Sequence, residues 1–91
     1  MIFITTYKTK PYITQDELRE LMAAFAEHGE DPGVTAHYMA ADASRGVTIS
    51  ERDDAGDAYR NMLNYHQWIE FDTKPMLTIE DAVPHILDAI G

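Results

Sequence analysis

Cysteine is absent from this chain of 91 residues. Its absence excludes disulfide bonds, zinc sites built on thiolates and a cysteine nucleophile. A chain of this length is expected to fold as one compact domain, residues 1–91, with little surface to bury. Small domains without disulfide bonds or a structural metal often gain buried surface by associating with a second copy. We therefore expect a single domain that forms an oligomer.

Basic residues are scarce as well. Lys and Arg number 7 against 16 Asp and Glu, which gives a formal net charge of −9. Because a surface that binds phosphates needs local positive charge, nucleic acid and anionic membranes are poor candidate partners. The chain has no run of 18 apolar residues, and its start, MIFITTYKTK, lacks the layout of a signal peptide. A cytoplasmic location is expected.

Sequence signatures of the common cofactors are also missing. There is no GxGxxG or GK[ST] loop for a nucleotide, no GxSxG nucleophile motif and no HxH, HxxxH or HxxE spacing for a metal. The acidic stretch 53–57 is too short for a calcium loop, and compensation of a helix dipole accounts for it. We expect no metal site and no cofactor.

The residues that are present alternate between strand and helix signals. β-Branched and aromatic residues predict a strand over residues 2–8. Thr14 and Glu17 have the spacing of a capping box, which predicts the start of a helix, and Gly29 is suited to end it. Two extended runs, 34–42 and 46–52, predict a hairpin.

The second half of the chain continues this alternation. Residues 54–67 predict a helix with Asp53 or Asp54 as its N-cap, and residues 68–76 predict the last strand. A final amphipathic helix begins near Thr78. Since Pro84 is unfavourable in a helix interior, we expect the N-cap at Asp81, which would put Pro84 in the first turn.

Alternation along the strands divides the side chains of the sheet between two faces. A hairpin loop centred on Ser44 and Arg45 would pair Ala40 with Ile49. The face that we expect to lie against the helices carries Ala36, Tyr38, Ala40, Val47, Ile49, Ile69 and Phe71. The opposite and more polar face would carry Thr5, Tyr7, His37, Met39, Ser50, Arg52, Glu70 and Asp72.

The predicted order of elements is β-α-β-β-α-β followed by a helix. This is the ferredoxin-like pattern of the α+β class, in which a four-stranded antiparallel sheet carries its helices on one face. The fold therefore leaves the second face of the sheet without a helix.

This order, in a cysteine-free chain of this length, resembles the dimeric α+β-barrel proteins. The local likeness lies in residues 65–78, Tyr-His-Gln-Trp-Ile-Glu-Phe-Asp-Thr-Lys-Pro-Met-Leu-Thr, followed by a short amphipathic helix. That segment is similar to an uncharacterised bacterial family within the superfamily. The resemblance implies a homodimer in which two sheets pack face to face, so that the helix-free face becomes the inside of a barrel.

The resemblance implies a range of functions and no single reaction. Relatives in the superfamily include cofactor-free monooxygenases, lactone isomerases, cyclases, haem-degrading enzymes and stress-induced proteins. One hypothesis is a homodimer that binds a small apolar or aromatic molecule and acts as a cofactor-free oxygenase, isomerase or cyclase. The alternative is a non-catalytic dimer with a ligand-binding, stress-related or interaction role, so catalysis itself stays open.

The polar face offers one group of candidate substrate-binding residues. His37 and Arg52 are expected neighbours across the hairpin, with Tyr7 on the first strand close by. Arg52 would hold an enolate or carboxylate, and His37 would move a proton near neutral pH. The structural alternative is that these side chains pair with Glu70, Asp72 or a second subunit.

A pocket under the helices offers a second group of candidates. The catalytic candidates are His66, as an acid or base, and Tyr38 and Tyr59, whose hydroxyls would orient a substrate oxygen. Trp68 would stack on an aromatic ring of the substrate. The structural alternative for His66 is a hydrogen bond from the end of its helix to a backbone carbonyl.

Overall fold

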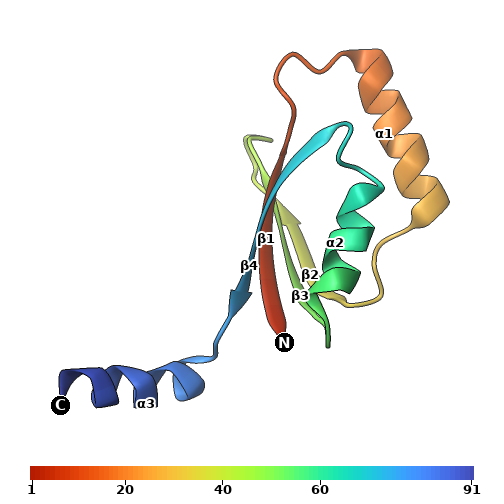
Figure 1. Cartoon of the computed structure of the whole chain (residues 1–91). Coiled ribbons are helices and arrows are strands. Elements are labelled where there is room, and N and C mark those ends of the chain that lie inside the picture. Colours follow the sequence, from red (N-terminus) through yellow and green to blue (C-terminus); the bar gives the residue numbers. More distant parts are fainter.

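The computed structural model describes all 91 residues and has seven elements in the predicted order (Figure 1). The strands are β1 (Ile2–Thr9), β2 (Val34–Met39), β3 (Gly46–Glu51) and β4 (Ile69–Met76). The helices are α1 (Gln15–His28), α2 (Ala55–Leu63) and α3 (Ile79–Ile90). The strands form one antiparallel sheet in the order β2-β3-β1-β4. The predicted α+β class and ferredoxin-like arrangement are confirmed.

The predicted caps of the first two helices are confirmed. The Thr14 hydroxyl accepts from the Glu17 backbone N–H at 3.1 Å, and the Glu17 carboxylate accepts from the Thr14 N–H at 3.3 Å. Gly29 ends α1 with a φ of 73°. Asp54 caps α2 by accepting from the Gly56 N–H at 2.8 Å. These local signals therefore decide where both helices begin.

The expected N-cap of the last helix at Asp81 is wrong. Thr78 is the N-cap, and its hydroxyl accepts from the Asp81 N–H at 3.1 Å, so Pro84 lies inside α3. Pro84 has no N–H to donate to the carbonyl of Glu80, and α3 keeps its helical turns at the cost of that one hydrogen bond. None of the helices has both the length and the apolar composition that crossing a membrane requires.

The hairpin has the predicted faces but a different register. Ala36 pairs with Ile49 and Tyr38 with Val47, whereas the sequence suggested Ala40 opposite Ile49. The loop is longer than expected, because residues 40–45 close with the Ala40 N–H donating to the Arg45 carbonyl at 2.9 Å. Since the shift along each strand is an even number of residues, the division of side chains between the two faces is unchanged.

A β-bulge interrupts the pairing of β2 with β3. Val34 pairs with Ser50 and Ala36 with Ile49, which leaves Thr35 as the extra residue on β2. The Thr35 hydroxyl donates to the Ile49 carbonyl at 3.2 Å. Because of this extra residue, Val34 and His37 both lie on the same side of the sheet, against the helices.

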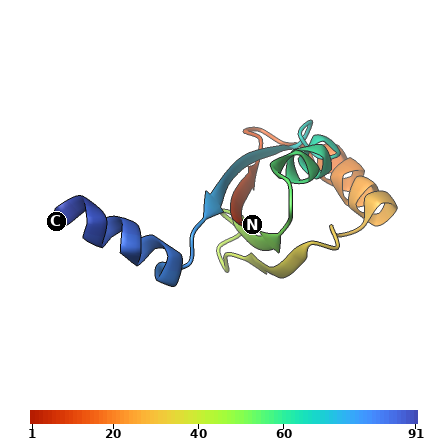
Figure 2. The same ribbon diagram turned by 60° about the horizontal axis from the view of Figure 1, so that its bottom comes forward.

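The prediction of which face lies against the helices is wrong for β1, β2 and β3, since Thr5 and Tyr7 were also expected on the helix-free face. Both α1 and α2 lie over the face that carries Tyr7, His37, Met39 and Ser50 (Figure 2). Ala36, Tyr38, Val47 and Ile49 therefore face away from the helices, with Ile2 and Ile4 of β1. Alternation separates two faces but does not say which one a helix covers. The helices cover the face that carries Phe3 and Tyr7, the aromatic residues of the central strand β1. Ile69 and Phe71 of β4 lie there as predicted.

Few side chains are buried, and the core is small. Phe3 is 3% exposed, and the other buried apolar residues are Ala58, Tyr65 and Trp68. Tyr65 donates from its hydroxyl to the Gly29 carbonyl at 3.2 Å, and Trp68 from its indole N–H to the Glu20 carboxylate at 3.4 Å. These contacts connect α1 to the turn after α2. Because no residue of α1 is buried, space remains between this helix and the sheet.

Candidate functional site

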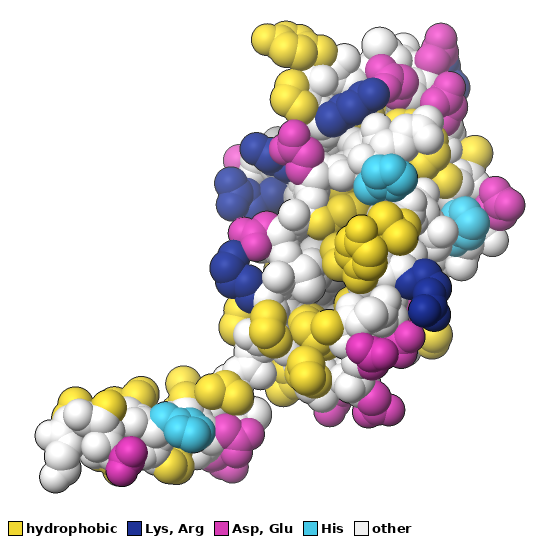
Figure 3. Space-filling view, viewed as in Figure 1, with side chains coloured by type: hydrophobic (Ala, Val, Ile, Leu, Met, Phe, Trp, Pro, Cys, Tyr) yellow, Lys and Arg dark blue, Asp and Glu magenta, His cyan; other side chains and the backbone are white.

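A chamber lies between the helices and the sheet. Its volume is about 450 Å³, which is in the range of small-molecule binding sites. The apolar lining comes from α1 (Leu18, Leu21, Met22, Phe25), α2 (Ala58, Met62), the turn after it (Tyr65) and the sheet (Val34, Met39, Ile69, Phe71). Apolar side chains also gather on the visible surface of the body (Figure 3). Met22 is 62% exposed and Met39 is 58% exposed, so the chamber is open to solvent.

Three polar side chains form a connected row in the wall of this chamber. The Tyr7 hydroxyl forms a hydrogen bond with Nε2 of His37, and Nδ1 of the same ring lies 3.3 Å from Oε2 of Glu30. We call Tyr7, His37 and Glu30 the relay. If Nδ1 donates to the carboxylate, Nε2 is free to accept the phenolic proton. The relay thus connects the chamber wall to Glu30, whose side chain is 45% exposed.

Tyr7 holds its phenolic proton more tightly than a free tyrosine does. Burial raises the pKa of Tyr7 above its ordinary value of 10.0, and the negative charge of Glu30 raises it further. Tyr7 is therefore a neutral hydrogen-bond donor at physiological pH. The neighbouring rings hold it in position: His37 stands edge-on to it at 5.6 Å between ring centroids, and Phe71 lies at 6.2 Å.

Alkaline titration should detect this raised pKa. An unfolded tyrosine loses its proton near pH 10, whereas folded Tyr7 keeps it to higher pH. The stability that this retained proton provides is present below about pH 10 and is lost as the pH rises through the raised pKa. In phenolate absorbance, Tyr7→Phe should therefore remove amplitude from the high-pH end of the curve. Loss of the Tyr7→Phe amplitude from the range near pH 10 instead would contradict this prediction.

Gly46 makes room for the Tyr7 ring. The two residues pair across β1 and β3, and a Cβ on Gly46 would overlap the ring and hydroxyl of Tyr7. Gly46 is itself buried. The strand therefore needs a glycine at this position, because the aromatic ring lies directly over the backbone.

Arg52 forms an ion pair with Asp31. Their side chains are 10% and 9% exposed, so the pair is almost fully buried at the edge of the chamber. Asp31 also accepts from the Gly33 N–H at 2.7 Å. The pair joins the end of β3 to the turn before β2, one residue after Glu30, and so supports the position of the relay carboxylate. Arg52 pairs with neither Glu70 nor Asp72.

Residues 1–90 match a family described as "Domain of unknown function (DUF3303)". The chain belongs to the DUF3303 family. No curated protein matches this chain significantly.

The DUF3303 chain keeps the first group of candidate residues together. Tyr7 and His37 are in contact, as the sequence suggested. The expected pairing of His37 with Arg52 across the hairpin is wrong, because His37 lies opposite Thr48, and Arg52 lines the same chamber while paired with Asp31. They lie under the helices, however, because the helices cover the face that we expected to be free. No group of three or more His, Asp or Glu side chains converges as a metal site would require.

The second group of candidates does not line the chamber. Tyr38 is 64% exposed on the helix-free face, and Tyr59 is 63% exposed on α2. His66 is exposed, and its Nδ1 lies 2.8 Å from the Leu63 carbonyl, which is the structural alternative considered for it. Trp68 is buried, with its indole N–H engaged by Glu20. The expectation of a pocket under the helices is met, but by other residues.

Sequence reasoning missed Glu30, Asp31 and Gly46. Glu30 and Asp31 lie in a segment, 29–33, that has the composition of an ordinary turn. In the sequence, Gly46 stands only as the first residue of the extended run 46–52. A glycine inside a strand often marks a place where another group lies close against the backbone. Gly46 was therefore the only signal in the sequence for the position of the Tyr7 ring.

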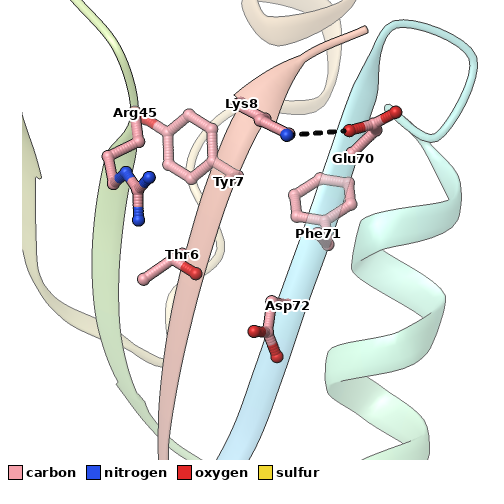
Figure 4. A pocket seen from close by; sticks show the side chains of 7 residues that line it. All are labelled: Thr6, Tyr7, Lys8, Arg45, Glu70, Phe71 and Asp72. Atoms are coloured by element: carbon pink, nitrogen blue, oxygen red, sulfur yellow. Dashed lines mark ion pairs between the residues drawn. The ribbon is translucent and has the colours of Figure 1, made fainter.

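A second hollow of about 320 Å³ opens on the helix-free side of the DUF3303 sheet (Figure 4). Lys8 and Glu70 form an exposed ion pair across it at 3.6 Å, with Arg45 and Asp72 nearby. Exposed pairs of this kind contribute little binding energy. The mixed charges favour no one class of ligand here.

Proposed function

We propose that this DUF3303 chain binds a small apolar or aromatic molecule in the chamber and transfers a proton to or from it without a cofactor. The observation that carries the proposal is the relay, whose Tyr7 and His37 side chains lie in the wall of a chamber with a mostly apolar surface. Such a site combines an apolar surface for affinity with a few polar groups that fix orientation.

The chemistry follows from the order of the three side chains. His37 would accept the Tyr7 proton on Nε2 while its Nδ1–H stays bonded to the Glu30 carboxylate. The resulting phenolate would take a proton from an enol, a phenol or an acidic C–H of the bound molecule. Return of the proton to another atom completes an isomerisation. In a cyclisation, the carbanion left by the lost C–H proton attacks a carbonyl carbon of the same molecule, and the carbonyl oxygen then takes the proton. An oxygenation would need molecular oxygen as a second reactant.

We also propose that the chain belongs to the dimeric α+β-barrel superfamily and forms a homodimer through the helix-free face of its sheet. The ferredoxin-like order of strands supports this membership. The face that would be covered carries Ala36, Tyr38, Val47 and Ile49, which are apolar and not buried. Association would remove this surface from water.

A second candidate function is ligand binding without catalysis. The raised pKa of Tyr7 favours it, because a phenol that keeps its proton is a better hydrogen-bond donor to a bound oxygen than a base. The two candidates share the chamber and differ only in whether a proton leaves the ligand.

The test uses 2-naphthol, an aromatic probe with one hydroxyl and an exchangeable carbon-bound proton. Amide shifts of the ¹⁵N-labelled protein should change around the chamber, and Met62→Trp, which fills it, should abolish the effect. Tyr59→Trp, on the exposed side of the same helix, is the matched control. Absence of any saturable shift with the wild type would overturn the proposed binding.

Catalysis is tested by following exchange of the 2-naphthol C1 proton with deuterium by NMR. The wild type should accelerate the exchange over buffer, and Tyr7→Phe or His37→Gln should reduce the protein-dependent rate by about 10²-fold or more. Both variants should still bind the probe, and Tyr59→Phe should behave as wild type. Binding without any acceleration would favour the non-catalytic candidate.

A further inference from the structure

Helix α3 has an apolar side with no partner in its own chain. It extends away from the body beyond the end of β4 (Figures 1 and 2), and none of its residues is buried. Ile79 and Ile90 are each 77% exposed and Leu87 is 60% exposed. Together with Val83 and Ile86 these residues follow helical spacing and form one stripe, the α3 stripe. An isolated helix of this length is marginal in water, so α3 needs packing to be stable.

The sheet has a complementary surface without a partner. Its helix-free face carries apolar side chains from three neighbouring strands, none of them buried: Ile2, Ile4, Ala36, Tyr38, Val47 and Ile49. Four strands at normal spacing are about 14–19 Å wide. The 12 residues of α3 make a helix about 18 Å long. One helix therefore fits across one sheet.

The amount of exposed surface fits an oligomer. The chain exposes 6788 Å², about 1,400 Å² more than size scaling gives for a compact monomer of its mass. Its radius of gyration is 15.9 Å, against about 12 Å for a compact domain of this length. A stable interface buries about 800 Å² on each partner, so the excess is enough for one.

We propose that α3 is exchanged between two copies of the chain, each helix packing its stripe across the helix-free face of the other copy. This inference rests on the proposed homodimer and keeps its interface on the helix-free face, but it covers that face with the partner's α3 in place of the partner's sheet. One two-fold interface would then cover both unpartnered surfaces of both chains. Two sheets packed face to face would leave the α3 stripes exposed, which makes exchange the better arrangement.

The deciding experiment detects contacts between chains only. Since the chain has no cysteine, Asp88→Cys on the polar side of α3 carries a single nitroxide label. This labelled chain, at natural isotope abundance, is mixed with unlabelled ¹⁵N wild type. We expect the amides of Ile4, Val47 and Ile49 to broaden, and α2 amides to stay sharp. A dimer without broadening of the sheet amides would overturn the exchange while leaving self-association in place.

A pair of variants tests the stripe itself. Ile86→Asp should reduce the mass measured by light scattering from twice 10.3 kDa to the monomer value, and His85→Asp, on the polar side of α3, should remain a dimer. Because α3 makes no extensive contact with its own body, Ile86→Asp should keep the fold and the binding of 2-naphthol. A monomeric wild type would overturn the inference, and a dimeric Ile86→Asp would do so as well. If the wild type did not bind 2-naphthol, the proposed ligand binding in the chamber would be wrong, and the exchange of α3 would be unaffected.

Discussion

Replacement of Asp31 by alanine should lower the free energy of unfolding by about 3 kcal/mol, because it leaves the charge of Arg52 buried without a counter-ion. Both side chains are about nine-tenths buried, so water cannot replace the lost carboxylate. The variant also loses the acceptor for the Gly33 N–H. Chemical denaturation followed by the fluorescence of Trp68, which is buried in the wild type, measures the change.

Two controls separate this effect from a general loss of charge. Asp16→Ala removes an ion pair with Arg19 that is exposed on α1, and it should change stability by less than about 0.5 kcal/mol. The double substitution Asp31→Leu with Arg52→Met removes both charges and should restore much of the loss. If Asp31→Ala were as stable as Asp16→Ala, the pair would not support the turn before β2.

Substitution of Gly46 by alanine should lower the free energy of unfolding by about 2 kcal/mol, which is typical of inserting a methyl group into a filled site. The new Cβ would overlap the Tyr7 ring, and either the ring or β3 would have to move. Movement of the ring would break its hydrogen bond to His37 and disconnect the relay. Thermal unfolding measures the loss of stability, and the ¹⁵N shifts of the His37 ring report the broken contact.

Removal of the Tyr7 ring should abolish the destabilisation that Gly46→Ala causes. In a Tyr7→Ala background the overlapping ring is gone, so adding the methyl group to Gly46 should be neutral or slightly stabilising. A double-mutant cycle over the two positions should therefore give a coupling of about 2 kcal/mol. If Gly46→Ala lowered the free energy of unfolding equally in both backgrounds, the glycine would not be required for the packing of the Tyr7 ring.

Much of the fold could be predicted from local signals. The capping box at Thr14 and the cap at Asp54 decide helix starts through contacts within three residues, which a sequence displays directly. The strands follow from β-branched and aromatic runs. Thr78 shows the limit of this reasoning, because avoidance of Pro84 outweighed a good capping residue in the prediction but not in the structure.

The candidate site was harder to predict, because its residues meet through the tertiary fold. His37 and Tyr7 were expected together, since they lie on the same face of neighbouring strands. Which face the helices cover depends on how α1 and α2 pack, and both faces of this sheet carry large side chains. Glu30 joins the relay through a turn whose path is set by the buried pair of Asp31 and Arg52. No pattern within the turn itself shows this.

The bulge at Thr35 makes β2 sensitive to length as well as to residue type. In an unbroken strand Val34 and His37, three residues apart, would point to opposite sides of the sheet. The extra residue turns both toward the chamber. Deletion of position 35 would thus place Val34 and His37 on opposite sides of the sheet without altering either side chain. When sequences related to this chain are aligned, the count of residues between Asp31 and His37 is therefore as informative about function as the residues themselves.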